Sequence, residues 1–211
     1  MTERRTGVIT DLPPGTPELL AHLTPRAREI VVAARALVEE SGPAALTMRA
    51  LADRLGIKAP SLYKHFPDKS AVEAEVIAIG LLETAQALEA AEERHAQERH
   101  AHRRDTDAAM DGPEPPTLLA ALGAAYRADA LAHPYVYMLV TEGPLPRQAL
   151  PEGLEYRAAA PLLRACGHDM DRARAVWAFA HGMVTLEIHG RFPPGADLAA
   201  AWRTGVRALE P

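Results

Sequence analysis

Apolar residues recur at helical spacing along most of the chain, and proline or glycine separates the periodic segments. A first helix is predicted after Thr24-Pro25, a cap followed by proline at the first helical position, and it ends at Gly42-Pro43. A longer helix is predicted from Asp68 onward. Further helices are predicted at Leu118–Ala132, Tyr135–Thr141, Gln148–Cys166, Met170–Gly190 and Asp197–Leu209. Because alanine and leucine are also abundant, the chain is predicted to be all-α.

A helix-turn-helix pattern occupies the segment from Leu46 to Lys69. Thr47 can cap a short first helix, and Gly56 supplies the tight turn that a residue without a Cβ makes at little cost. The apolar positions that can pack the two helices together are Leu51, Ala52, Leu55, Ile57 and Leu62. The polar, basic and aromatic residues left to face outward are Lys58, Pro60, Ser61, Tyr63, Lys64 and His65. Residues in this part of the motif reach base edges in the major groove of DNA.

The residues that follow strengthen this prediction. Phe66-Pro67 provides an aromatic anchor and a stop, and Asp68 can cap the next helix. Lys69 then falls in the first turn of that helix, where a cation beside free backbone N–H groups can hold a phosphate. The predicted DNA-binding surface consists of Thr47, Lys58, Pro60, Ser61, Tyr63, Lys64, His65 and Lys69.

These motifs resemble the DNA-binding domain of the TetR family of one-component repressors. The matching residues are Thr47, Ala52, Gly56, Leu62, Tyr63, His65, Phe66 and Lys69, with the upstream helix Arg26–Ser41. Family members vary most over Lys58–Ser61. The operator sequence of another family member can therefore not be assigned to this chain. The resemblance implies a three-helix helix-turn-helix domain joined to a helical ligand-binding and dimerisation domain. It also implies a dimer that binds a palindromic operator in double-stranded DNA.

The second half of the chain carries a further resemblance. The tract Val176–Met183 resembles the C-terminal regulatory domain of a TetR subset named for its Trp, His and Gly. The segments Ala125–Arg127 and Ala132–Pro134 are similar to the same subset. In the family, the last two helices form a four-helix dimer interface with their two-fold mates. The corresponding segments here are Met170–Gly190 and Asp197–Leu209.

The helix Met170–Gly190 is apolar around most of its circumference. Such a helix is expected between a domain core and a partner subunit. Gly182 costs about 1 kcal/mol relative to alanine in a helix interior, so another helix is expected to approach closely there. A charge introduced at Val184 or Val206 is predicted to give monomers.

A small-molecule effector site is predicted inside the second half. Trp177, His181 and Thr185 recur on one helical face. The predicted lining consists of Tyr126, Tyr135, Met138, Trp177, His181 and Thr185. An apolar wall with a few polar groups suits a largely apolar ligand with one hydrogen-bonding end. Ordinary core packing is the alternative for each of these residues.

Charge is divided unequally along the chain, whose formal net charge is −5. Residues 24–70 hold eight basic and five acidic side chains, whereas residues 71–211 hold thirteen basic and twenty acidic ones. The basic part can therefore face phosphates. Four parts are predicted: a flexible arm (1–23), the DNA-binding domain (24–70), a connecting helix with a charged linker (71–116) and the regulatory and dimerisation domain (117–211). Arg4 and Arg5 of the arm could reach a minor groove, although a solvated tail is preferred.

The histidines of the charged segment suggest a metal site. However, His95 and His100 do not share a helical face and no cysteine accompanies them, so they and His102 are interpreted as solvated surface. The single Cys166 excludes an intramolecular disulfide. It is interpreted as a small buried apolar residue rather than a redox sensor.

The sequence therefore predicts a cytoplasmic, ligand-responsive transcriptional repressor without a cofactor, released from DNA by its effector. No apolar run approaches the roughly 20 residues that cross a membrane. A transcriptional activator and an effector-independent DNA-binding protein remain alternatives. His181 with Glu187 or His189 suggests acid–base chemistry, but the chain has no nucleophile elbow, phosphate loop or HExxH motif, so an enzyme is not predicted.

Overall fold

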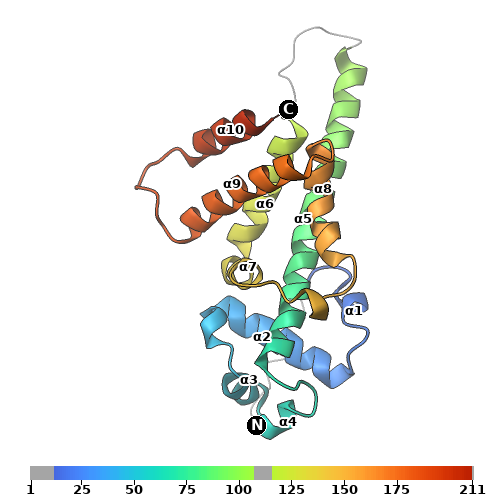
Figure 1. The fold of residues 1–211 in the computed structure, drawn as a ribbon, viewed down its shortest axis with the longest axis vertical. Helices are drawn as coiled ribbons and strands as arrows, with labels where there is room; N and C mark the ends of the chain where they lie inside the picture. Colours follow the sequence, from blue (N-terminus) through green and yellow to red (C-terminus); the bar gives the residue numbers. More distant parts are fainter. Residues whose placement is uncertain (1–11, 107–115, 211) are drawn as a thin grey trace, which may run out of the picture. The chain divides into compact units, whose positions relative to one another are not determined.

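The structure of the chain is a computed structural model, which describes residues 12–106 and 116–210. Within these ranges all regular structure is helical, which confirms the predicted all-α fold (Figure 1). The α-helices are α1 (Thr16–Leu19), α2 (Pro25–Ser41), α3 (Met48–Leu55), α4 (Ala59–Leu62), α5 (Lys69–Thr106), α6 (Leu118–Ala132), α7 (Pro134–Thr141), α8 (Leu154–Ala165), α9 (Met170–Ile188) and α10 (Leu198–Leu209). Arg4 and Arg5 lie outside the described residues.

The chain divides into two compact units, each made of two separate segments. The first unit combines Met1–Glu83 with His133–Glu155, and the second combines Thr84–Ala132 with Tyr156–Pro211. Helix α7 therefore belongs to the first unit although it follows α6 of the second. The four parts predicted from the sequence stay a prediction. The boundaries of the two compact units differ from theirs.

The core of the first unit forms around α2, whose predicted helical bounds are confirmed. Thr24 caps this helix, since its hydroxyl accepts a hydrogen bond from the Ala27 backbone N–H, and Gly42 ends it with a φ of 83°. The fully buried side chains of this core are Ile30, Val31, Ala34 and Val38 from α2, Leu51 from α3, Leu62 from α4, and Val72, Val76 and Ile79 from α5. The cluster couples α2 and α5 to the two short helices between them.

Helix α7 is packed into the same core. Val136 is 2 % exposed and joins the cluster around α2. A Cβ at Gly80 of α5 would lie 2.6 Å from Cγ2 of Val140 and 3.0 Å from Cγ1 of Val136, so glycine is what allows this close approach. The Tyr135 ring lies against Gly42 at the end of α2.

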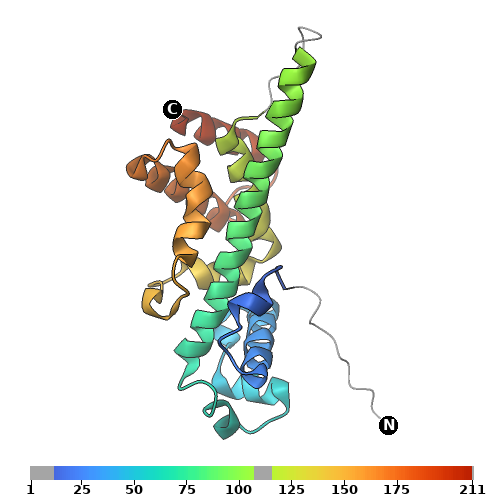
Figure 2. The same ribbon diagram turned by 90° about the vertical axis from the view of Figure 1, so that its right-hand side faces the viewer.

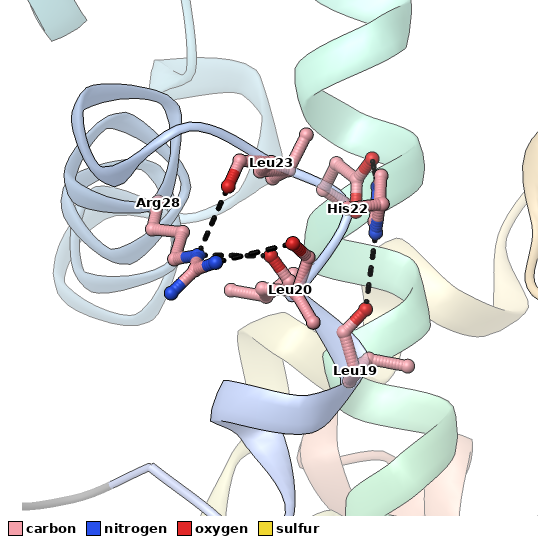
Figure 3. Close-up of polar contacts among 7 residues, drawn as sticks. Leu19, Leu20, His22, Leu23 and Arg28 are labelled. Carbon is pink, nitrogen blue, oxygen red and sulfur yellow. Dashed lines mark hydrogen bonds and ion pairs between the residues drawn. The ribbon is translucent and has the colours of Figure 1, made fainter.

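Residues 12–23 fold onto the first unit, so the prediction of a flexible arm is wrong for them (Figure 2). Leu20 is only 2 % exposed. Arg28 of α2 donates from Nε to the carbonyl oxygens of Leu20 and Leu23, at 3.0 and 3.1 Å, and from Nη2 to that of Ala21, at 3.1 Å (Figure 3). The guanidinium thus holds the turn after α1 against α2 through three carbonyl oxygens.

A buried carboxylate joins three helices of the second unit. The side chain of Glu187 on α9 is 5 % exposed. It accepts hydrogen bonds from Nε of Arg127 on α6, at 2.8 Å, and from Nε1 of Trp202 on α10, at 2.7 Å. A buried carboxylate is stable only when paired and hydrogen-bonded, so these contacts fix α6, α9 and α10 together.

The close approach of two helices occurs at Gly205 of α10 and not at Gly182. A Cβ at Gly205 would lie 2.1 Å from Cζ of Phe179 on α9, whose ring meets that of Trp202 edge-on at 5.5 Å. A Cβ at Gly182 would have no heavy atom within 4 Å among the described residues. The close approach expected at Gly182 is therefore not made by any described helix of this chain.

The distal part of α5 is more buried than its charged sequence predicts. His95 is 6 % exposed, so its assignment to solvated surface is wrong. It lies seven residues after Leu88 and four after Ala91, both buried, and thus continues their helical face. His100 is exposed and His102 half-buried.

Two ion pairs fasten α8 to this part of α5. Arg157 binds both carboxylate oxygens of Glu89 at 2.7 Å, and Nε of Arg164 binds Glu92 at 2.8 Å. Hydrogen bonds from these guanidinium groups lower the pKa of both glutamates, against the opposing effect of burial. Because α8 begins at Leu154, the prediction that it starts at Gln148 is wrong. Pro151 disfavours a helical residue before it, and Gly153 has a φ of 78°.

Candidate DNA-binding surface

The helix-turn-helix forms as the sequence predicts. The hydroxyl of Thr47 accepts a hydrogen bond from the Ala50 backbone N–H at 3.0 Å and so caps α3. Gly56 ends α3 in the left-handed region, with a φ of 64°. Leu51 and Ala52 are buried, and α4 packs against α3. The packing of these apolar positions determines which residues of the turn and of α4 face outward.

The predicted reading residues lie on or beside α4. This helix covers only Ala59–Leu62, and a turn continues it to His65. Leu62 and Phe66 are buried and anchor the element from both sides of the turn. Lys58, Pro60, Tyr63 and Lys64 are exposed, with Tyr63 at 54 %, whereas Ser61 and His65 are half-buried. Tyr63 is therefore an exposed aromatic side chain between two buried ones.

Lys69 is less free than the sequence suggests. Oδ1 of Asp68 accepts a hydrogen bond from the Ala71 backbone N–H at 2.9 Å, which confirms the predicted start of α5. The ammonium of Lys69 lies 2.9 Å from Oε1 of Glu73 one turn later. A phosphate contact by Lys69 therefore requires exchange of this exposed ion pair, which is worth little in water.

Arg49 is a further candidate for a phosphate contact that the sequence pattern does not single out. It is exposed in the first turn of α3, directly after the Thr47 cap, and its side chain has no partner among the described residues. Arg54 on the same helix is instead held by Glu40 through two hydrogen bonds of 2.6 and 2.7 Å. These bonds lower the pKa of Glu40 and raise that of Arg54. Of the two described arginines of α3, Arg49 is thus the one that presents an unpaired charge beside free helix N–H groups, an arrangement that suits a phosphate.

Replacing Arg49 by alanine is expected to weaken binding to all DNA sequences alike. It should reduce the slope of log affinity against log salt concentration by about one, because one phosphate contact is lost. The matched change Arg54→Ala should leave that slope unaltered. Fluorescence anisotropy titrations at several salt concentrations measure both slopes, and equal slopes for the wild type and Arg49→Ala would exclude Arg49 from the surface.

The predicted effector residues are divided between the two units. Tyr135 and Met138 lie on α7 of the first unit, and Tyr126, Trp177, His181 and Thr185 lie in the second. Trp177 is 49 % exposed and stacks on the half-buried His181, with ring centroids 5.7 Å apart. Tyr126 packs against buried Leu88, Ala91 and Leu122. Oγ1 of Thr185 is buried without a hydrogen-bond partner among the described residues.

Two further features are the single cysteine and the arrangement of possible metal ligands. Cys166 is 4 % exposed, and burial raises the pKa of its thiol, while Arg172 lowers it and Asp169 raises it. Within the described ranges, no three His, Cys, Asp or Glu side chains gather as they would around a metal ion. No described helix is both long and apolar enough to span a membrane.

Two family models match separate parts of the chain. The model described as bacterial regulatory proteins of the tetR family matches residues 30–76, which include the helix-turn-helix and the start of α5. The model described as the tetracyclin repressor-like C-terminal domain matches residues 119–209. No curated protein sequence matches the chain.

Solved structures share the fold at low sequence identity. One is a protein of unknown function from Rhodococcus sp. RHA1, with a TM-score of 0.65 and 23% identity over 90% of this chain and 98% of the other. Another is described as a possible TetR family transcriptional regulator from Streptomyces coelicolor A3(2), with a TM-score of 0.57 and 21% identity over 87% of this chain and 96% of the other. At such identity these likenesses show the fold alone.

Proposed function

Because the chain belongs to the TetR family of bacterial transcriptional regulators, we propose that it is a ligand-responsive repressor that binds a palindromic operator as a homodimer. Family members are DNA-binding regulators and not enzymes. The observation that supports operator reading best is the exposed surface around α4. There Tyr63 and Lys64 project between the buried anchors Leu62 and Phe66. We propose that Ser61, Tyr63, Lys64 and His65 read bases, while Thr47, Lys58, Pro60 and Lys69 contact the backbone, with Arg49 added.

Exposed apolar side chains of α9 support the homodimer. Met170, Trp177 and Leu186 are each more than 40 % exposed, and Ala178 is exposed beside them. The open space over Gly182 interrupts the same helix, so a helix of a second copy could approach there. Large apolar side chains that are this exposed fit a surface that a second copy covers. By contrast, Val184 and Val206 are buried in the protomer's own core, so a charge there would unfold the protomer rather than separate two copies.

Replacing Ala178 by glutamate is expected to give monomers, because a charge would be buried without a partner at the interface. The dissociation constant should rise by at least about tenfold. Ala159→Glu makes the same change at an exposed position of α8 and should leave the dimer intact. Size-exclusion chromatography with light scattering measures both. A wild-type protein that is monomeric at micromolar concentration would contradict the proposed dimer.

For the effector, we propose a site in the second unit near Tyr126 and His95. Nδ1 of His95 is buried without a hydrogen-bond partner among the described residues, on the face of α5 that also carries the buried Leu88 and Ala91. A buried polar atom of this kind needs a water or a ligand. A largely apolar ligand with one hydrogen-bonding end would suit these surroundings. Because Trp177 is exposed, a position in the dimer interface suits it better than a position in the lining of an interior pocket.

Ligand response and repression can be tested together. A metabolite panel is screened by thermal shift, and compounds that stabilise the protein are added to operator titrations and to transcription in vitro. The proposal expects a compound that raises the melting temperature, lowers operator affinity and restores transcription, because ligand and DNA prefer different states. If stabilising compounds leave operator affinity unchanged, the effector-independent alternative is favoured.

A further inference from the structure

A group of polar side chains interrupts the apolar core of the first unit where α2 packs against α5 and α7. The side chain of Arg35 on α2 is only 7 % exposed, and its Nη2 donates to Oε1 of Glu83 on α5. Glu39 lies one helical turn after Arg35, on the same face of α2. Nδ1 of His133, the residue directly before α7, is 3.9 Å from Oε1 of Glu39. All four residues belong to the first unit.

Three atoms of this group are buried without a hydrogen-bond partner among the described residues. They are Nε of Arg35, Oε2 of Glu39 and Nδ1 of His133. The 3.9 Å between Nδ1 of His133 and Oε1 of Glu39 is too long for a direct hydrogen bond. Buried polar atoms in folded proteins are nearly always bonded to protein, to an ordered water or to a ligand. The three atoms therefore indicate a site for a small polar molecule.

The chemistry of these atoms limits what can bind there. Nε of Arg35 needs an acceptor, and Oε2 of Glu39 needs a donor. Nδ1 of His133 donates or accepts according to the tautomer of the ring. An anion would be repelled by the Glu39 carboxylate, and a metal cation by the Arg35 guanidinium. A water molecule has two donors and two acceptor lone pairs, so it satisfies all three atoms with either tautomer.

We propose that Glu39 and His133 bind a buried water molecule, with Arg35 as its third partner, and that this water fastens the start of α7 to α2. A buried water typically makes about three hydrogen bonds to polar groups that otherwise lack a partner. His133 stands at the N-terminus of α7 without capping it through its side chain. Its imidazole instead links this point of the chain to α2 through the water. The site lies within the first unit and depends on neither the effector nor the dimer.

A crystal structure of the full chain at near-atomic resolution tests the proposal. It should contain one water bonded to Oε2 of Glu39, Nδ1 of His133 and Nε of Arg35, and as well ordered as these side chains. Glu39→Leu removes the acceptor at similar volume and should lose this water. Glu40→Leu is the matched control, because Glu40 is exposed and binds Arg54, and it should keep the water.

Nuclear magnetic resonance of the wild type measures the same water in solution, so the test does not depend on the folding of Glu39→Leu. A long-lived water beside Nε of Arg35 gives cross-relaxation between Hε and the water signal. In the rotating frame this cross-relaxation is opposite in sign to hydrogen exchange. Arg35→Lys lacks the Nε–H group and identifies the resonance.

The two measurements have outcomes that overturn the proposal. One is a wild-type crystal structure without a water at these atoms, or with a direct hydrogen bond between Glu39 and His133. Another is the absence of cross-relaxation between the Arg35 Hε and water in the wild type. A third is a Glu39→Leu crystal structure that keeps the water in place.

Discussion

Replacing both Tyr63 and Lys64 by alanine is expected to abolish selective operator binding. Each side chain should contribute about 1–3 kcal/mol if it contacts base edges, and the two together more than either alone. Both are exposed, and the buried Leu62 and Phe66 hold the element in place, so the fold should survive the double change. Electrophoretic mobility shifts with a DNA duplex that the wild-type protein binds selectively give the affinities of the wild type and of the variant.

The control for this double variant removes an equally prominent aromatic side chain elsewhere. Tyr156 on α8 is 64 % exposed, and Tyr156→Ala should leave operator affinity unaltered. Circular dichroism checks that the helices of each variant remain. Wild-type affinity in a folded Tyr63→Ala/Lys64→Ala protein would show that α4 does not read the operator.

Replacing Gly205 by alanine is expected to destabilise the second unit by about 1–3 kcal/mol, the usual cost of overpacking. The added Cβ would lie 2.1 Å from Cζ of Phe179, and the ring of Phe179 is confined by Trp202. The penalty should exceed the helix propensity that alanine adds. Urea unfolding followed by circular dichroism measures the change in free energy of unfolding.

Two further variants test this explanation. Gly182→Ala occupies open space and should not destabilise the protomer. The second change, Phe179→Leu, should recover part of the stability lost in Gly205→Ala because it removes the end of the ring. Equal destabilisation by Gly182→Ala and Gly205→Ala would mean that backbone conformation, and not the Phe179 contact, decides the effect.

Local chemistry accounts for what the sequence predicted correctly. Thr24, Thr47 and Asp68 cap helices through their own side chains, and Gly42 and Gly56 end helices through positive φ values. These signals act within a few residues, so they can be recognised without knowing the fold. The exposure of Lys58, Pro60, Tyr63 and Lys64 followed from the same reasoning, because packing of the neighbouring apolar positions leaves them outward, whereas their contacts with DNA stay a prediction.

Features that depend on distant partners were missed. Residues 12–23 contain two adjacent prolines, Pro13 and Pro14, and have no helical pattern in sequence, but Arg28 and Glu75 from two other helices hold the turn after α1. The sequence of α7 predicts a helix without indicating that its Val140 packs on Gly80. His95 was hidden among charged residues, and only the position of Leu88 and Ala91 on the same face explains its burial. Local sequence patterns therefore predict where a helix begins and ends better than they predict which distant residues it packs against.

The most direct test of a dimeric operator-reading protein is selection of duplexes from a random DNA pool by the full chain, followed by sequencing. We expect enrichment of one two-fold symmetric sequence whose half-sites are about 10 base pairs or a multiple apart, as two related reading elements require. The Tyr63→Ala/Lys64→Ala variant, selected in parallel, should not enrich it. Recovery of random sequences by the wild type, or of the same palindrome by the double variant, would contradict the account.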